Sequence, residues 1–195
     1  MKHVVRDMSK LPNKLPDIKI LDEVDKRLRK KSVEVKFPLP EEDKKRIQDM
    51  MDYLEMSQIP ELCEKYQLRA GMGLSYVQVG INKRIFVIVY EVEEQKFDRY
   101  IIINPKIKSM SEEKIYVAEG EGCLSINRPT VGIVPRNARI TLEYQDMDGN
   151  TQTIRVREEL AICFQHEIDH LNGILFVDRI DPKNPYKGKD TYRAI

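Results

Sequence analysis

Hydrophobic residues recur at helical spacing in two stretches of this chain. In residues 41–55, three acidic residues come first and apolar residues then return every three or four positions, as on the buried face of an amphipathic helix. A second helical pattern covers residues 157–171 and stops at Asn172-Gly173, where a glycine commonly ends a helix. The pattern therefore predicts one helix near the N-terminus and one late helix.

Shorter apolar or alternating runs predict β-strands. Asp148-Gly149 lies between two alternating runs and is one of the strongest signals for a hairpin turn. We predict a loop over residues 71–80 and irregular structure over the basic residues 1–19 and in the polar tail. The expected class is α+β, with antiparallel strands packed around the late helix and a further helix near the N-terminus. The strands are expected at residues 84–90, 100–104, 114–117, 138–144, 151–156 and 174–177.

Length and charge narrow the range of functions. A chain of 195 residues can form one domain with a hydrophobic core, so we expect a single domain over residues 1–195. The 33 basic residues nearly balance the 32 acidic residues, which argues against nucleic acid or an anionic membrane as the main partner. No apolar run approaches the roughly 20 residues that span a bilayer, and we find no signal peptide. We therefore expect a cytoplasmic protein with no membrane partner.

The late helix contains the sequence QHEIDH, which includes two of the three histidines in the chain. His166 and His170 are four residues apart, so their imidazoles lie on one face of a helix and can bind the same metal ion. Glu167 is rotated by about 100° from His166, so it can reach a water molecule without binding the metal. This is the HExxH arrangement of metal-dependent hydrolases. Two ordinary histidines on a solvated helix are the alternative, but apolar residues flank the motif.

A catalytic zinc-type centre needs a third protein ligand. Known metalloproteases take this ligand either from a third histidine, in the pattern HExxHxxGxxH, or from a glutamate farther downstream. In this chain Phe176 occupies the position of the third histidine, and no glutamate follows Glu167. Cys123 is the best remaining candidate, because glycines that precede it allow the backbone to approach a metal closely. Cys63 and Cys163 fit the simpler role of buried hydrophobic residues.

Three motifs in this sequence resemble those of the peptide deformylases. Residues 71–78, GMGLSYVQ, are similar to the G-x-G-φ-A-A-x-Q motif of that family, where φ is an apolar residue. Residues 121–125 are identical to its EGCLS motif, and residues 165–170 match QHExDH. The resemblance extends from about residue 20 to residue 180. The sequence departs from the family at Ser75-Tyr76, where two alanines are expected, and at Glu159, where an apolar pocket residue is expected.

The resemblance implies an enzyme that removes the formyl group from the N-terminal formyl-methionine of newly made polypeptides. It implies that Cys123, His166 and His170 bind the metal and that Glu167 accepts a proton from water and delivers it to the leaving amine. The side chain of Gln78 and the backbone N–H of Leu124 would stabilise the oxyanion. The substrate would contact the backbone of Gly73 and a methionine pocket. That pocket would be lined by Met72, Leu124, Ile162 and Cys163.

The same resemblance implies the cofactor and the partners. The family's native metal is ferrous iron, Fe(II), and zinc, nickel or cobalt can replace it. The expected partners are the N-termini of nascent polypeptides, with transient proximity to the ribosome and no nucleic-acid specificity. The sequence leaves the oligomeric state open, with a monomer favoured. The C-terminal tail lacks a long helical pattern, which resembles the type 2 form of Gram-positive bacteria.

Two other functions remain as alternatives. A metallopeptidase would need the third ligand that is missing at Phe176 or downstream of Glu167. A structural zinc module, for example one that docks on the ribosome, would need a fourth cysteine or histidine ligand. His3 and Cys63 are the spare candidates for that ligand, and neither has the spacing of one. An exchangeable water on the metal would indicate a catalytic site, whereas four protein ligands would indicate a structural one.

Overall fold

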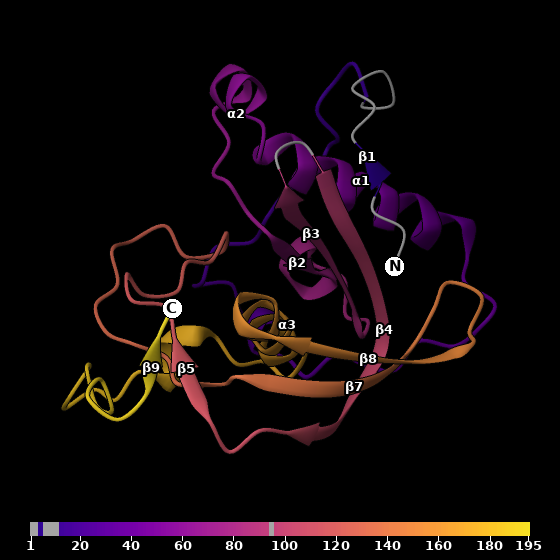
Figure 1. Cartoon of the computed structure of the whole chain (residues 1–195). Coiled ribbons are helices and arrows are strands. Elements are labelled where there is room, and N and C mark those ends of the chain that lie inside the picture. Colours follow the sequence, from indigo (N-terminus) through magenta and orange to yellow (C-terminus); the bar gives the residue numbers. More distant parts are fainter. Residues whose placement is uncertain (1–3, 6–11, 94–95) are drawn as a thin grey trace.

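The computed structural model describes residues 4–5, 12–93 and 96–195. Within these residues the fold is α+β, with an antiparallel six-stranded sheet, a smaller sheet and three α-helices (Figure 1). The strands of the main sheet are ordered β2-β3-β4-β7-β8, and β1 pairs with β4. Their bounds are β1 Val4–Val5, β2 Gly73–Ser75, β3 Ile85–Glu93, β4 Lys96–Met110, β7 Arg139–Gln145 and β8 Thr151–Arg157.

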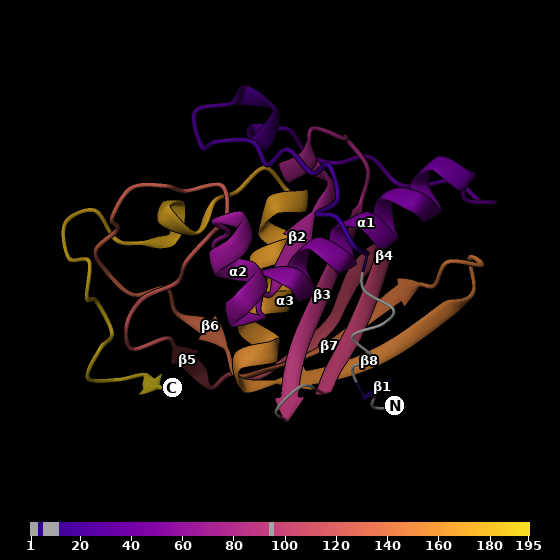
Figure 2. The same ribbon diagram turned by 90° about the horizontal axis from the view of Figure 1, so that it is seen from above.

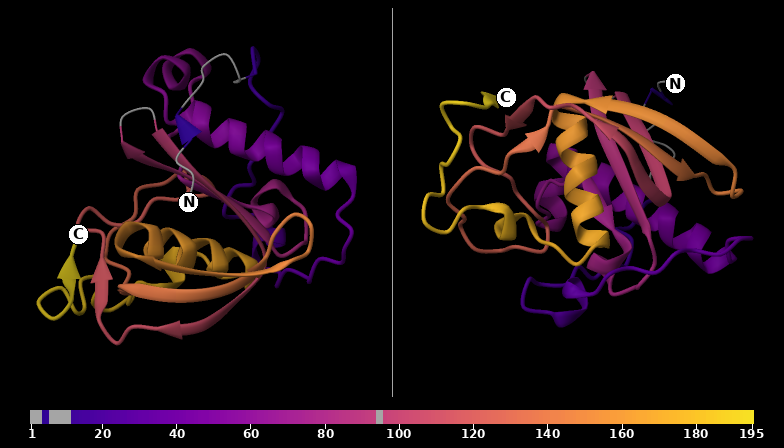
Figure 3. Two further views of the ribbon diagram at one scale, coloured as in Figure 1. Left: turned by 45° about the vertical axis from the view of Figure 1, so that its right-hand side comes forward. Right: turned by 90° about the horizontal axis from the view of Figure 1, so that it is seen from below.

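The main sheet has a helix on each face. Successive side chains of a strand point to opposite sides, so one strand packs against both helices. From β3, Ile85 and Val87 join a core cluster that contains residues of α1, whereas Phe86 and Ile88 join a second cluster that contains residues of α3. Figures 2 and 3 show α1 crossing the strands and α3 lying against the curved β7–β8 hairpin. The helices are α1 Glu41–Ser57, α2 Pro60–Tyr66 and α3 Glu158–Leu171.

Strand β8 leads directly into α3 without a connecting loop. The change of direction occurs at Glu158, whose φ of 56° lies in the left-handed region that non-glycine residues rarely adopt. The backbone N–H of Glu158 donates to the carbonyl of Ala138, and its carboxylate accepts two hydrogen bonds from Arg193. These contacts fix the start of the helix that carries the HExxH residues.

A smaller three-stranded sheet, ordered β6-β5-β9, lies beside the N-terminal half of α3. β5 pairs with β6 in the antiparallel sense and with β9 in the parallel sense. The described residues also form three short 3₁₀ helices, of which η3 follows β2 directly. The bounds are β5 Lys114–Tyr116, β6 Arg136–Asn137, β9 Arg193–Ala194, η2 Lys26–Arg29, η3 Tyr76–Val79 and η4 Phe176–Arg179.

The predicted strand at residues 174–177 is wrong. Its buried residues Leu175 and Phe176 pack in a core cluster and pair with none of the strands that the structure describes, and the chain forms η4 there. The carboxylate of Asp178 accepts a hydrogen bond from the backbone N–H of Leu175 at 2.8 Å, which stabilises this short turn. The apolar pattern therefore reflected burial and not strand pairing.

Three further expectations need correction. The segment predicted as a loop at residues 71–80 contains β2 and η3. Val4–Val5 forms a strand within the arm expected to be irregular, and residues 1–3 and 6–11 of that arm lie outside the described residues. The tail contains β9, whose residue Arg193 pairs with Ile115. No helix among the described residues is long and apolar enough to cross a membrane.

Candidate active site

Helix α3 brings His166, Glu167 and His170 together in the interior of the protein. The centroids of the two imidazole rings are 5.0 Å apart, and His170 and Glu167 are only 1% and 2% exposed. Cys123 comes from the segment between β5 and β6, and its Sγ lies 3.3 Å from Nε2 of His170. Residues more than 40 positions apart in the sequence therefore meet at one point.

The side chains of Cys123, His166 and His170 fit a single metal ion. One ligand atom from each residue lies within 4.8 Å of the other two, and sulfur and imidazole nitrogen are donors for zinc and iron. Nδ1 of His166 donates to Oε2 of Glu121 at 2.8 Å. Because Nδ1 is occupied by Glu121, Nε2 is the nitrogen of His166 that is available to a metal, as in most metal-binding histidines. Burial lowers the pKa of His170 well below its usual value, which favours the neutral form that binds a metal. For His166, burial also lowers the pKa, but the hydrogen bonds with Cys123 and Glu121 outweigh it and raise the pKa well above its usual value.

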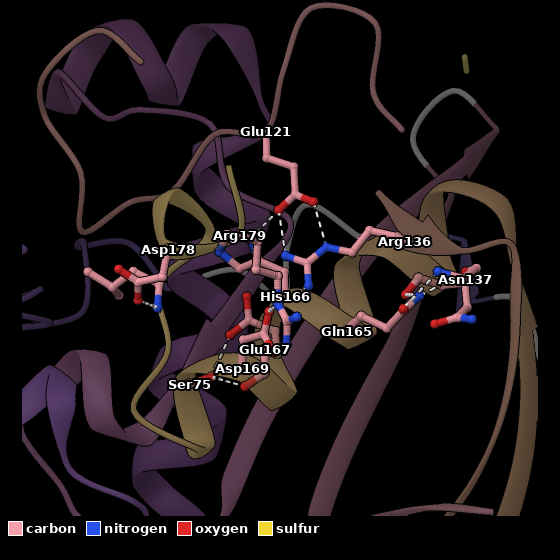
Figure 4. Close-up of polar contacts among 12 residues, drawn as sticks. Ser75, Glu121, Arg136, Asn137, Gln165, His166, Glu167, Asp169, Asp178 and Arg179 are labelled. Carbon is pink, nitrogen blue, oxygen red and sulfur yellow. Dashed lines mark hydrogen bonds and ion pairs between the residues drawn. The ribbon is translucent and has the colours of Figure 1, made fainter. Parts of the chain in front are cut away.

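A buried network of charges holds this helix against the segment that carries Cys123 (Figure 4). Arg136, from β6, donates two hydrogen bonds to Glu121, at 2.7 and 2.9 Å, and one to Asp169 of α3 at 2.5 Å. Arg179 donates two further hydrogen bonds to Asp169. Burial alone would raise the pKa of Glu121, but the hydrogen bonds from Arg136 and His166 lower it to about 2. Glu121 is therefore a fixed negative charge behind His166.

Glu167 lies beside the proposed metal ligands without being one of them. Its Oε2 accepts a hydrogen bond from the hydroxyl of Ser75 at 2.5 Å, and its Oε1 lies over Gly73, where an added Cβ would approach it to 2.5 Å. Burial raises the pKa of Glu167, an effect that His166 and Ser75 partly offset. A carboxyl group of this kind can both accept and return a proton near neutral pH.

Two hydrogen-bond donors are available on the other side of the site. The Oε1 atom of Gln78 accepts from the backbone N–H of Ser75 at 2.9 Å, so its Nε2 points the other way, to 3.6 Å from Sγ of Cys123 and 3.1 Å from Oγ of Ser125. Within the described part of the chain, the backbone N–H of Leu124 donates to no other residue. Both groups could donate to an oxygen atom of a bound substrate.

A cavity of about 310 Å³ opens beside these residues. Its apolar lining includes Ile162 and Cys163 of α3, and burial raises the pKa of the Cys163 thiol well above its usual value. Glu159 also lines the cavity, where it accepts a hydrogen bond from Tyr90 at 3.3 Å. The residues singled out from the sequence that line this cavity are Met72, Gly73, Gln78, Cys123, Leu124, Ile162, Cys163, His166 and Glu167.

The two residues that depart from the alanine pair point in different directions. The hydroxyl of Ser75 contacts Glu167, whereas Tyr76 is buried in the α1 side of the core and donates to the carbonyl of Asp43 at 2.9 Å. Tyr76 therefore fills the core and does not line the cavity. Cys63 contacts the carbonyl of Leu68, away from the site. His3 lies outside the described residues.

Reasoning from the sequence missed several residues of the site. Arg69 lines the cavity, and its guanidinium donates to the carbonyls of Cys123, Leu124 and Ile126. No motif marks this arginine, and only the fold shows that it holds the cysteine segment in place. Glu121 could have been found, because it begins the EGCLS motif two residues before the cysteine.

Comparisons with known proteins show the family to which this sequence is similar. The sequence model of the family described as polypeptide deformylase matches residues 18–186. A peptide deformylase of Limosilactobacillus reuteri is 48% identical over 163 residues, which cover 82% of this chain and 88% of that protein. Peptide deformylase 2 of Geobacillus stearothermophilus is 45% identical over 171 residues, which cover 88% of this chain and 93% of that protein.

Solved structures give the same result. The crystal structure of peptide deformylase from Thermotoga maritima is similar with a TM-score of 0.67 and 34% identity, and the match covers 85% of this chain and 98% of that one. The enzyme from Thermus thermophilus gives a TM-score of 0.69 and 33% identity, over 84% of this chain and 86% of that one. The chain therefore belongs to the peptide deformylase family, in the form that resembles the enzymes of Gram-positive bacteria.

Proposed function

We propose that the cavity beside α3 is the place where this enzyme removes the formyl group from the N-terminal formyl-methionine of new polypeptides. We propose further that Cys123, His166 and His170 hold one divalent metal ion there. The observation that carries this proposal is the meeting of their three ligand atoms within 4.8 Å, beside the cavity that Cys123 and His166 line. A structural zinc site would need a fourth ligand, and no fourth cysteine, histidine or carboxylate belongs to this group among the described residues.

The three proposed ligands suit only a few kinds of metal ion. One thiolate and two neutral imidazoles suit ferrous iron, which we propose as the native metal, and they also suit zinc, nickel and cobalt. When bound, such an ion acts as a Lewis acid toward a carbonyl oxygen and lowers the pKa of water. The remaining chemistry depends on side chains of this protein.

Glu167 moves the protons of the reaction. The oxygen of water adds to the formyl carbon as its proton passes to the Glu167 carboxylate. That proton then passes to the amine nitrogen as the C–N bond breaks, so that formate and a free N-terminal amine are released. The raised pKa of this buried carboxyl supports the role, because the group must take up a proton and give it back in each cycle.

Gln78 and Leu124 stabilise the negative charge that develops on the formyl oxygen. Nε2 of Gln78 is held toward Cys123 by the hydrogen bond that its Oε1 accepts from Ser75. The N–H of Leu124 follows Cys123 directly in the chain. Donors that are oriented before the reaction cost little reorganisation when the charge appears.

The rest of the cavity binds the substrate. The methionine side chain lies in the apolar part of the cavity, and the backbone of Gly73 approaches the peptide closely because it carries no side chain. We propose that residues 1–195 act as one catalytic domain and as a monomer that works transiently near the ribosome. The methionine pocket consists of Met72, Leu124, Ile162 and Cys163.

The test is formate release from a formyl-Met-Ala-Ser peptide by protein purified under anaerobic conditions, with ferrous iron as the supplied metal. The matched control is the acetyl-Met-Ala-Ser peptide, whose larger acyl group should be released at least about 10²-fold more slowly if the site selects the formyl group. A fully metal-loaded protein that releases no formate would contradict the proposed function.

A further inference from the structure

Ser75 contributes a hydroxyl group to the active site at a position where the family motif has alanine. It ends β2, is 0% exposed and donates to Oε2 of Glu167 at 2.5 Å (Figure 4). The same hydroxyl also lies 3.3 Å from the backbone carbonyl of Glu167. A hydroxyl has one proton to donate, and the shorter contact to a charged group is the stronger hydrogen bond.

This hydrogen bond distinguishes the two oxygen atoms of the Glu167 carboxylate. Oε2 is directed toward Ser75, whereas Oε1 lies over Gly73 in the wall of the cavity. Position 73 leaves enough room for this orientation because it is a glycine, since a Cβ atom there would come within 2.5 Å of Oε1. Oε1 therefore lies on the side of Gly73, a residue that lines the cavity.

The backbone of Ser75 orients a second group. Its N–H donates to Oε1 of Gln78 at 2.9 Å, which directs the amide nitrogen of Gln78 toward Cys123. An alanine could make this backbone contact as well. The contact to Glu167, in contrast, requires the hydroxyl, so a substitution of the side chain can separate the two effects.

We propose that Ser75 is a positioning residue for formyl hydrolysis, whose hydroxyl holds Oε2 of Glu167 so that Oε1 alone exchanges protons with water and with the leaving amine. Ser75 keeps its own proton throughout the cycle. The inference rests on the proposed role of Glu167. It goes beyond the family motif, since alanine at this position has no hydroxyl to donate.

The first experiment compares Ser75→Ala with the wild-type enzyme. We expect kcat to fall on the order of tenfold, as for the loss of one hydrogen bond to a charged group, while KM and the bound iron per chain remain unchanged. Ser75→Cys, which has a similar volume but a weak donor, should show the same loss. The matched control is Ser32→Ala, because Ser32 is also buried but its hydroxyl has no partner among the described residues. This control should keep the wild-type kcat.

The second experiment is a double-mutant cycle with Glu167→Gln, measured by single-turnover formate release at high enzyme concentration. If Ser75 acts through the Glu167 carboxylate, Ser75→Ala should have no further effect in the Glu167→Gln background. An equal loss in both backgrounds, loss of the metal, or a wild-type kcat for Ser75→Ala would overturn the inference. These outcomes differ from failure of the proposed function, in which the wild-type enzyme itself would release no formate.

Discussion

His166 and Glu167 are adjacent in the chain, but they contact different parts of the protein. His166 donates to Glu121 of the segment that carries Cys123, whereas Glu167 accepts from Ser75 at the end of β2. The helix geometry causes this separation, because consecutive side chains diverge by about 100° around the axis. One residue can therefore bind a metal while its neighbour serves as the base.

At the residue scale, the first prediction concerns the two cysteines that line the cavity. Cys123→Ala should lose most of its bound metal, because two imidazoles alone form an incomplete site. Cys163→Ala should retain about one metal per chain, since Cys163 is not in the group of ligand atoms. Metal analysis of the two purified variants distinguishes them. Full metal occupancy and activity in Cys123→Ala would rule out the proposed ligand set.

The second prediction at this scale concerns Gln78. Replacing it with leucine removes the amide that points toward Cys123 but keeps a side chain of similar size. We expect kcat to fall by about 10²–10³-fold, as for other oxyanion donors, with little change in metal content. Steady-state kinetics and metal analysis of the same preparation give the answer. An unchanged kcat would show that Gln78 takes no part in stabilising the oxyanion.

At the scale of elements, local patterns predicted the parts of the fold that local forces determine. The helical periodicity of residues 41–55 corresponds to α1, and the Asp148-Gly149 turn joins β7 to β8. By contrast, β4 extends well beyond the expected residues 100–104. Asn104, with a φ of 51°, and the register shift between Ile103 and Lys106 allow this strand to continue past Pro105. No local pattern predicts such a bend, because the pairing with β7 stabilises it.

The same distinction applies to the candidate site. The motifs predicted Cys123, His166, His170 and Glu167, since their spacing or glycine context limits the chemistry open to them. Arg69 and Arg136 carry no such signal. Their roles arise from contacts between elements that only the folded chain brings together, and α2 and β9 were missed for a similar reason. The sequence alone showed Ser75 only as a departure from a motif.

The third prediction belongs to this scale, because Arg136 joins β6, the Cys123 segment and α3. Arg136 is 2% exposed, so Arg136→Met would leave Glu121 buried without its main cation. Breaking a buried ion pair in this way should destabilise the protein by about 3–5 kcal/mol. Urea unfolding of metal-loaded protein measures the change.

Arg139→Met provides the matched control for this experiment. The side chain of Arg139 is 40% exposed and pairs with Glu113 on the surface, so its loss should cost no more than about 1 kcal/mol. Similar destabilisation of the two variants would show that the buried network contributes no more than a surface ion pair.

At the scale of the whole molecule, the charges of Glu121, Arg136 and Asp169 affect how the enzyme acquires its metal. They connect the segment of Cys123 to α3 through protein contacts alone, so we expect the three proposed ligands to keep their places whether or not an ion is bound. Metal exchange can then take place in the folded enzyme after synthesis. The ion that the site binds then depends on the local concentration of each metal ion and on its affinity. Zinc and nickel bind more tightly than ferrous iron at equal concentration. With ferrous iron as the proposed native metal, we expect activity in the cell to depend on iron availability as well as on the amount of enzyme.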